Sequence, residues 1–222
     1  MALVILVRHG QTDENVSGRI SGQGPAPLNS RGQAQARLAA EVLAPLGVTR
    51  LWSSPVVRAH QTAAMLDERL QVGIEEVVDL REVGYGSWEG KQFNDIRSER
   101  AAQQVFQNPL HAVFPKGESL LGVQQRGVRF IESIRYTDAC GPMVLVSHGD
   151  TIRTALAHYL GLAFNDYRRI NIDNGALSVV ELCGDQSRVK AVNFVPQAGK
   201  MCLESFAATW QKTQTLTTWL TT

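Results

Sequence analysis

Two apolar segments, far apart in the chain, end in the same short sequence. Residues 2–7 lead into His9-Gly10, and residues 143–146 lead into His148-Gly149. Short apolar runs rich in β-branched residues predict buried strands. In open α/β sheets, ligands bind at the carboxyl ends of such strands. The repeat therefore predicts a sheet in which two imidazoles follow two buried strands and face one substrate.

Predicted strands and helices alternate along the rest of the chain. The remaining strand candidates are residues 51–53, 74–78, 176–182 and 189–195, and the last two suit a sheet edge. Strands that alternate with helices indicate a mostly parallel sheet with helices on both faces. We therefore expect a three-layer α/β/α fold with a mostly parallel central sheet.

Three polar residues are expected to begin helices. Ser30 starts a sequence with the spacing of a capping box, Ser54 precedes a proline, and Asp150 follows the second His-Gly pair. Serine and aspartate are favoured at helix N-caps, and proline is favoured just after them. Two glycine-rich stretches, residues 18–27 and 80–91, are predicted to be loops.

The chain shows no proline- or serine-rich linker, so we expect a single catalytic α/β domain over residues 1–200. A helical insertion is expected at about residues 92–116, within a helical stretch that extends to residue 136 and is interrupted at prolines. The C-terminal segment, residues 201–222, is rich in threonine and receives no structural prediction.

The balance of charges limits the classes of partner. The 222 residues carry a formal net charge of +1, which gives no general attraction to nucleic acid or to anionic membranes. No apolar stretch is long enough for a membrane span, and the start of the chain lacks the pattern of a signal peptide. We therefore expect a cytoplasmic enzyme or binding protein without nucleic-acid or membrane partners. The sequence leaves a homodimer open.

Metal binding is not expected from the sequence. His9 and His148 offer two imidazoles, but no carboxylate stands at a characteristic ligand spacing from them. The three cysteines are far apart and form neither a disulfide framework nor a paired metal motif.

Two arginines near the predicted strand ends suggest that the ligand is an anion. Arg8 precedes His9, and a guanidinium binds phosphate oxygens in a bidentate fork. Arg58 lies in the first turns of a predicted helix, where the helix dipole favours anions and an arginine gains most if it pairs with one. The alternative for Arg58 is an exposed side chain on a solvated face. His9 itself is compatible with a nucleophile, a general base, a metal ligand or a structural residue.

An acidic residue in the second glycine-rich loop is a candidate proton donor. Glu82 lies close to Tyr85 and Trp88 in the sequence, and burial beside aromatic rings raises a carboxyl pKa. Glu89, in the same loop, is the rival candidate. His148 suits a hydrogen bond to a phosphoryl oxygen in the transition state.

Five segments, in this order, resemble the histidine phosphatase superfamily, also called the phosphoglycerate-mutase-like family. Residues 8–15 match its RHGxTxxN signature, residues 27–36 resemble PLxxxGxxQA, and residues 53–62 resemble SSxxxRAxQT. Glu82 and His148 complete the pattern. The first loop departs from it, because Pro25 replaces a usual aspartate and Ser21 replaces a usual glutamine or threonine.

The resemblance implies roles for these residues. His9 would attack phosphorus and become a phosphohistidine, and Glu82 would protonate the leaving-group oxygen and later activate water. No metal or organic cofactor would be needed. The phosphate pocket would be formed by Arg8, Asn15, Ser21, Gly22, Arg58, His148 and the backbone N–H of Gly149.

The resemblance favours the phosphatase branch. True mutases of the family usually have a longer insertion and an ERxYG-like acid loop, whereas residues 81–86 read REVGYG. The loop is more similar to those of ribazole-phosphate and broad-specificity phosphatases. We therefore expect a phosphomonoesterase that hydrolyses a small phosphorylated metabolite. A phosphoglycerate mutase is the alternative, followed by a binding protein that has lost catalysis.

Overall fold

A central sheet organises the molecule. The computed structural model describes residues 2–137 and 141–197, and all six strands of this part of the chain form one sheet in the order β3-β2-β4-β1-β5-β6. Their bounds are Ala2–Arg8 (β1), Arg50–Ser53 (β2), Ile74–Glu76 (β3), Met143–Ser147 (β4), Leu177–Cys183 (β5) and Gln186–Phe194 (β6). The predicted strands are therefore confirmed. The expected segment 201–222 lies outside the described residues.

The two strands that precede the histidines are neighbours at the centre of the sheet. β1 and β4 pair in parallel, with Arg8 opposite Ser147. The backbone N–H of His9 donates to the carbonyl of Ser147 at 3.0 Å, so the ladder continues to the first histidine. The sheet therefore brings both His-Gly pairs together at the carboxyl ends of its central strands, as the repeat predicts.

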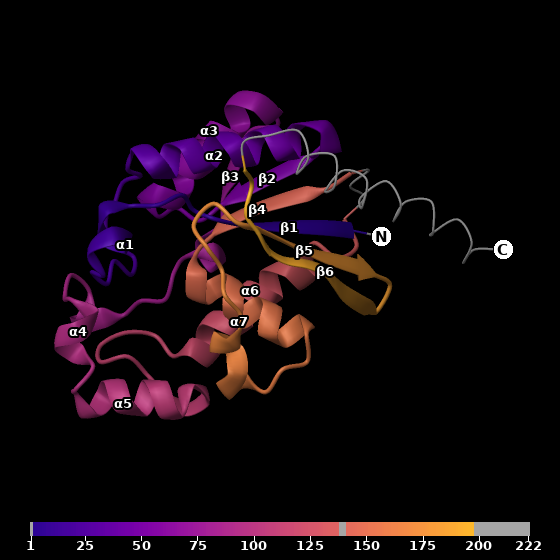
Figure 1. Cartoon of the computed structure of the whole chain (residues 1–222). Coiled ribbons are helices and arrows are strands. Elements are labelled where there is room, and N and C mark those ends of the chain that lie inside the picture. The colour runs from indigo at the N-terminus through magenta and orange to yellow at the C-terminus, as the bar shows by residue number, and fades with distance from the viewer. Residues whose placement is uncertain (1, 138–140, 198–222) are drawn as a thin grey trace.

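The sheet is mixed, and helices cover both of its faces (Figure 1). The pairs β1–β4, β2–β4 and β2–β3 are parallel, while β5 and β6 add antiparallel pairs at one side. Helices α2 (Ser30–Leu43) and α3 (Val57–Leu70) lie on one face, and α6 (Leu120–Ser133) and α7 (Gly149–Tyr159) lie on the other. The three-layer α/β/α prediction is confirmed.

Successive residues of β1 enter different cores. Ile5 packs in a cluster with Leu43 and Leu66 from the α2–α3 layer, whereas Leu6 packs in a cluster with Leu120 and Leu156 from the α6–α7 layer. Side chains alternate between the faces of a strand, so a strand covered on both faces is apolar throughout. This explains why residues 2–7 are all apolar.

The caps of three helices differ from prediction. Asn29, not Ser30, caps α2, and its side chain accepts a hydrogen bond from the Gly32 N–H. Ser54 lies in the turn before α3, because Val56 occupies the N-cap. His148 occupies the N-cap of α7, which places Asp150 in the first turn. The side chain of Asp150 contacts other groups, described below.

Short helices surround the edge of the sheet where the histidines lie. Helix α1 (Asp13–Ser17) follows β1 directly and was not predicted. Helices α4 (Phe93–Ile96) and α5 (Arg100–Gln107) form a lobe that projects below the end of the sheet in Figure 1. They fall within residues 92–116, where helical structure was expected. No helix of the described residues is long and apolar enough to cross a membrane.

A contact between two glycines brings α2 close to the end of β1. A Cβ atom built on Gly10 would lie 2.3 Å from the carbonyl oxygen of Gly32, which is backbone and cannot rotate away. The Gly10 N–H also donates to Thr62 Oγ1 at 3.1 Å, so α3 holds the same turn. The turn after His9 is therefore fixed by both helices of this layer.

We predict that Gly10→Ala lowers the free energy of unfolding by about 1–3 kcal/mol, the usual cost of overpacking. Gly127→Ala is the matched control, because its Cβ would meet Thr151 Cγ2 at an ordinary 3.6 Å and alanine favours the helix by up to about 1 kcal/mol. Urea denaturation of both variants measures the difference. Equal stabilities would contradict the steric role of the Gly10–Gly32 contact.

Candidate active site

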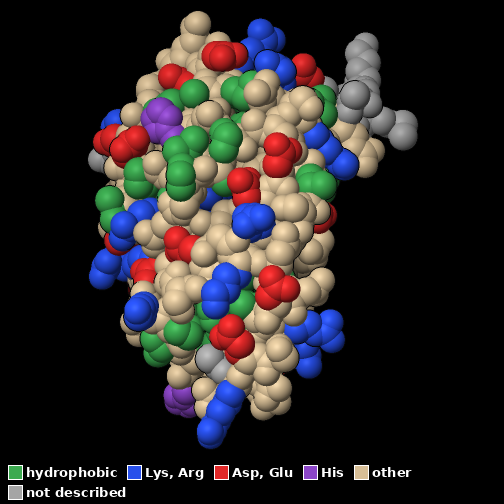
Figure 2. Space-filling view, turned by 90° about the vertical axis from the view of Figure 1, so that its left-hand side faces the viewer, with side chains coloured by type: hydrophobic (Ala, Val, Ile, Leu, Met, Phe, Trp, Pro, Cys, Tyr) green, Lys and Arg blue, Asp and Glu red, His purple; other side chains and the backbone are tan. Residues whose placement is uncertain are grey.

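A cavity of about 430 Å³ opens at the carboxyl ends of β1 and β4. Residues of the strand ends, the first loop, the acid loop and the α4–α5 lobe all line it. Figure 2 shows the molecule from this side, with basic and acidic side chains interspersed over the surface. Among the predicted site residues, the lining includes Arg8, His9, Asn15, Ser21, Gly22, Arg58, Glu82 and Gly149.

The ring of His9 is held in one tautomer. Its Nδ1 lies 2.7 Å from the carbonyl oxygen of Gly10, which accepts only, so Nδ1 carries the proton. Its Nε2 accepts a hydrogen bond from Arg58 Nε at 3.0 Å and therefore has a lone pair. Burial lowers the pKa of His9 well below its usual value, and the charges of Arg58 and Arg8 lower it further. The ring is neutral at pH 7, with a nucleophilic Nε2.

Arg58 is buried, so the alternative of a solvated arginine is wrong. The first turn of α3 places it against the first loop, where its guanidinium donates to the carbonyls of Gly22 at 2.6 Å and Gly24 at 3.3 Å. Arg8 is anchored by a hydrogen bond to the carbonyl of Ile172 at 2.5 Å. Both guanidiniums are thus fixed beside His9 without a carboxylate within 4.0 Å among the described residues.

Three buried polar atoms near His9 have no hydrogen-bond partner in the described part of the chain: Arg8 Nε, Ser21 Oγ and His148 Nδ1. Arg8 and Ser21 line the cavity with His9, and the ring of His148 lies 5.1 Å from that of His9, centroid to centroid. Buried polar groups are rarely left unpaired. All three can donate to an anion, whereas the fourth such atom, Glu14 Oε2, is an acceptor.

His148 lies deeper than the sequence suggests. It is fully buried and is not among the residues that line the cavity. Its Nε2 is 2.8 Å from Ser54 Oγ, a contact that orients the ring and that the sequence did not predict. Burial lowers the pKa of His148 as well, followed in effect by the charge of Arg58. His148 therefore lies beside His9, below the open surface of the cavity, with its Nδ1 unpaired.

Asn15 and Gly149 present donors to the cavity. The Asn15 Oδ1 accepts from the Thr12 N–H at 3.1 Å and from Asn174 Nδ2 at 3.1 Å, so its amide NH₂ is the group left for a ligand. Gly149 is the first residue of α7, and N–H groups at a helix N-terminus favour anions. A Cβ atom at Gly149 would lie 3.6 Å from the guanidinium carbon of Arg8, an ordinary van der Waals contact.

The side chain of Glu82 is buried at the cavity wall, with 8% of the residue exposed. Its Oε1 accepts from the Val83 N–H at 3.0 Å and from Thr151 Oγ1 at 3.4 Å. Burial raises the pKa of Glu82, and the negative charge of Asp150 raises it further. Asp150 accepts from Tyr85 Oη at 2.6 Å and pairs with Arg153 at 2.9 Å. Glu82 is thus the carboxyl favoured in its protonated form.

Glu89 has a different part in the loop. Its Oε1 accepts from the backbone N–H groups of Tyr85 at 3.1 Å and Gln23 at 3.4 Å, and it does not line the cavity. It therefore ties the acid loop to the first loop, which favours Glu82 over Glu89 as the proton donor.

Most of the chain matches one known protein family. The sequence profile of the histidine phosphatase superfamily (branch 1) matches residues 4–195. The chain belongs to this superfamily. The match includes every residue that was predicted for the site.

Relatives in the superfamily include phosphatases and a mutase. The chain is 28% identical over 193 residues to the adenosylcobalamin/alpha-ribazole phosphatase of Salmonella typhimurium, covering 85% of this chain and 94% of the relative. It is 33% identical over 185 residues to a "Probable phosphoglycerate mutase GpmB" of Yersinia pestis, covering 82% and 85%. A mycobacterial glucosyl-3-phosphoglycerate phosphatase, solved in complex with VO3, has a TM-score of 0.80 and 28% identity, covering 87% and 100%.

The structure of this histidine phosphatase also reveals site residues that the sequence did not indicate. Arg153, Arg168 and Asp150 line the cavity, and Asn174 Nδ2 donates to the His9 carbonyl at 3.2 Å. Arg19 also lines the cavity, whereas Lys91, Arg97 and Lys116 do not. Arg153 follows Asp150 by one helical turn, so an i, i+3 pair was the one signal available.

A buried arginine of α6 supports the acid loop from behind. Arg126 Nη1 donates to the carbonyls of Asp79 and Arg81 at 2.6 Å each, and Nη2 donates to the carbonyl of Glu82 at 3.0 Å. Its guanidinium also bonds Glu118, whose Oε2 accepts from the Gly84 N–H at 2.7 Å. The backbone on both sides of Glu82 is therefore fixed by one ion pair.

We predict that Arg126→Met lowers the free energy of unfolding by at least about 2 kcal/mol, because three carbonyls lose a charged donor. Arg129→Met is the matched control on the same helix. Arg129 pairs with Asp79, but its side chain is 69% exposed, so its loss is expected to cost about 1 kcal/mol or less. Denaturant titration of both variants measures the two values. A loss no larger than the control's would refute the supporting role of Arg126.

Proposed function

We propose that this protein hydrolyses a small phosphorylated metabolite through a phosphohistidine formed on His9. The observation that carries the proposal is a set of unpaired buried donors close to His9, two on residues that line its cavity and the third on the neighbouring imidazole. Arg8 Nε, Ser21 Oγ and His148 Nδ1 are buried without partners, and the oxygens of a phosphoryl group would satisfy all three.

In the first step, His9 Nε2 attacks phosphorus and the bond from phosphorus to the leaving-group oxygen breaks. Glu82 transfers its proton to that oxygen, so the alcohol leaves neutral. The phosphoryl group takes the place of the hydrogen bond between Nε2 and Arg58 Nε, and Arg58 then donates to a phosphoryl oxygen. Transfer of this kind depends mainly on positioning and charge neutralisation.

In the second step, the Glu82 carboxylate takes a proton from water, whose oxygen attacks phosphorus. The bond between phosphorus and Nε2 breaks, phosphate leaves, and Glu82 is again protonated. The other phosphoryl oxygens are held by Arg8, Asn15, Ser21, Arg58, His148 and the Gly149 N–H. Gly22 contributes by fixing Arg58 through its carbonyl at 2.6 Å. No metal or organic cofactor takes part in this scheme.

The relatives indicate the class of substrate. One is a phosphatase of alpha-ribazole, and a structural neighbour is a phosphatase of glucosyl-3-phosphoglycerate. We extend to this chain only the feature that the two substrates share, a phosphate ester of a small molecule.

We predict that a base-stable, acid-labile phosphoryl group accumulates on His9 during turnover of p-nitrophenyl phosphate. Rapid quenching in alkali followed by peptide mass spectrometry locates the group. His9→Ala is expected to abolish it together with turnover, since the variant lacks the attacking Nε2. His60→Ala is the control. His60 is half-buried on α3, the helix that carries Arg58, and its Nε2 lies 3.4 Å from Glu76 Oε1, away from the cavity.

Turnover without a phosphorylated intermediate would refute the covalent mechanism. Isomerisation of 3-phosphoglycerate without release of inorganic phosphate would instead identify a mutase. Full activity of His9→Ala would contradict both.

We predict that Glu82→Gln lowers kcat/KM for ethyl phosphate about 100-fold or more, the usual contribution of a general acid. The loss for phenyl phosphate is expected to be at least tenfold smaller, because phenolate leaves without a proton. Glu89→Gln is the matched control, since glutamine retains an oxygen for the Tyr85 and Gln23 N–H groups.

The pH profile gives a second readout for Glu82. Because burial raises its pKa, the protonated form persists at higher pH than for an ordinary glutamate, and ethyl phosphate hydrolysis falls as pH rises through that pKa. Glu82→Gln should lack this alkaline limb. Equal losses for both esters would leave Glu82 with a structural role only.

A further inference from the structure

We propose that the outer half of the cavity binds the leaving group of a phosphomonoester that carries a flat apolar ring and a second anionic group, with Arg168 as the ligand of that anion. This inference rests on the proposed function, because it assigns the substrate class of the same site. Its basis is the wall formed by the α4–α5 lobe and the 3₁₀ turn Phe164–Arg169.

Aromatic rings form much of the outer wall. Phe93 from α4 and Phe106 from α5 meet edge to face with centroids 5.4 Å apart, and both line the cavity. Trp88 and Phe114 form a second edge-to-face pair at 5.3 Å, deeper in the same wall. Phe93 is 44% exposed and Phe106 is 36% exposed, although Trp88 and Phe114 are buried.

Exposed rings inside a cavity point to an apolar occupant. Covering two water-exposed phenyl rings with an apolar ligand is favourable, because apolar surface is removed from water. An aromatic ligand can also stack on such a pair or pack against it edge to face. Because Phe93 and Phe106 share their cavity with His9, the occupant that covers them is the alcohol part of the ester. A flat ring fits these two faces better than a flexible polyol.

Arg168 lies over an aromatic ring of this wall without an acidic partner among the described residues. Its guanidinium carbon lies 4.3 Å from the centroid of Phe106, and its Nε donates to Tyr167 Oη at 2.8 Å. No carboxylate lies within 4.0 Å of it among the described residues, whereas Arg169 pairs with Asp166 at 3.0 Å and Arg153 with Asp150 at 2.9 Å. Arg168 is thus a positioned cation whose charge is not neutralised.

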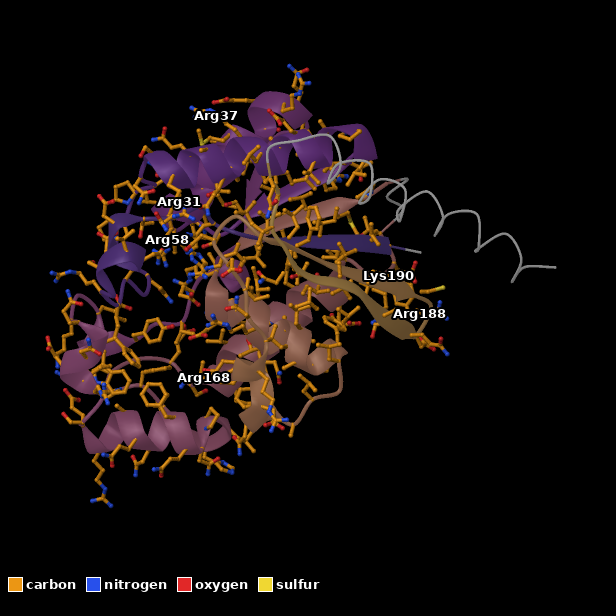
Figure 3. The ribbon with its side chains drawn as sticks, in the orientation of Figure 1. Arg31, Arg37, Arg58, Arg168, Arg188 and Lys190 are labelled. Atoms are coloured by element: carbon orange, nitrogen blue, oxygen red, sulfur yellow. The ribbon has the colours of Figure 1, made fainter. Side chains whose placement is uncertain are left out.

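This geometry determines which ligand Arg168 binds. The guanidinium lies over the Phe106 ring and its Nε donates to Tyr167, so the two terminal nitrogens are left for a bidentate contact. Carboxylates and phosphates accept such a fork, and neutral hydroxyls do not match its charge. Figure 3 shows Arg58 at the sheet end and Arg168 below it, beside α5. A single substrate therefore spans two cationic positions, with the ring between them.

The test compares three esters, ethyl phosphate, phenyl phosphate and 4-carboxyphenyl phosphate, on four proteins. These are the wild type, Arg168→Gln, Arg168→Lys and the control Arg169→Gln, whose side chain is 78% exposed and paired with Asp166. The quantity measured is the ratio of kcat/KM for 4-carboxyphenyl phosphate to that for phenyl phosphate. A ratio removes any common effect of a substitution on the phosphate site.

We expect Arg168→Gln to lower this ratio at least about tenfold, the effect of one lost charge-assisted hydrogen bond. Arg168→Lys should lie between it and the wild type, since lysine keeps the charge without the fork, and Arg169→Gln should leave the ratio unchanged. A phosphonomethyl group in place of the carboxylate tests whether a second phosphate-like anion is preferred. A ratio unaffected by Arg168→Gln overturns the anion site.

Phe93→Leu tests the ring. Because the rings that Arg168 lies over in the described structure are those of Phe106 and Tyr167, this variant should lower the preference for phenyl over ethyl phosphate at least about threefold and leave the carboxyl preference intact. An unchanged preference overturns the ring site. If the wild type hydrolyses none of the three esters and forms no phosphohistidine, the proposed function fails instead, so the two failures are distinguishable.

Discussion

The parallel pairing of β1 with β4 is the interaction on which the site depends. It places Arg8 opposite Ser147 and brings two imidazoles that lie 139 residues apart in the sequence to ring centroids separated by 5.1 Å. Residues that follow adjacent parallel strands lie together at the carboxyl ends of those strands because of the strand pairing itself. Helices α2 and α3 then add the close glycine contact and Arg58, and α6 adds the support for the acid loop.

Burial converts this arrangement into chemistry. The same removal of water that lowers the pKa of His9 raises that of Glu82, so both groups favour their neutral forms, as the proposed mechanism requires of its nucleophile and its acid. Neighbouring charges reinforce both effects, with arginines beside His9 and Asp150 beside Glu82. The separation of roles thus follows from what surrounds each side chain.

Much of the fold and the inner site could be predicted, because local sequence carried the information. The apolar runs fixed the strands, and His9, Arg58 and Glu82 each stood next to a strand end, a helix start or a glycine-rich loop. The misses were of another kind. The cap at Asn29, the depth of His148 and the contacts of Arg126 and Arg168 depend on packing between segments distant in sequence. Periodicity and spacing do not report such contacts.

The α4–α5 lobe stands outside the hydrogen-bonded sheet and holds none of the groups that surround His9. The phosphate end of the cavity is therefore formed at the ends of the central strands, whereas its far wall belongs to the separate α4–α5 lobe. Substitutions in the α4–α5 lobe can therefore change which alcohol the cavity accepts without altering the groups around His9. The residues that hold the phosphoryl group and the residues that contact its alcohol thus belong to different parts of the fold.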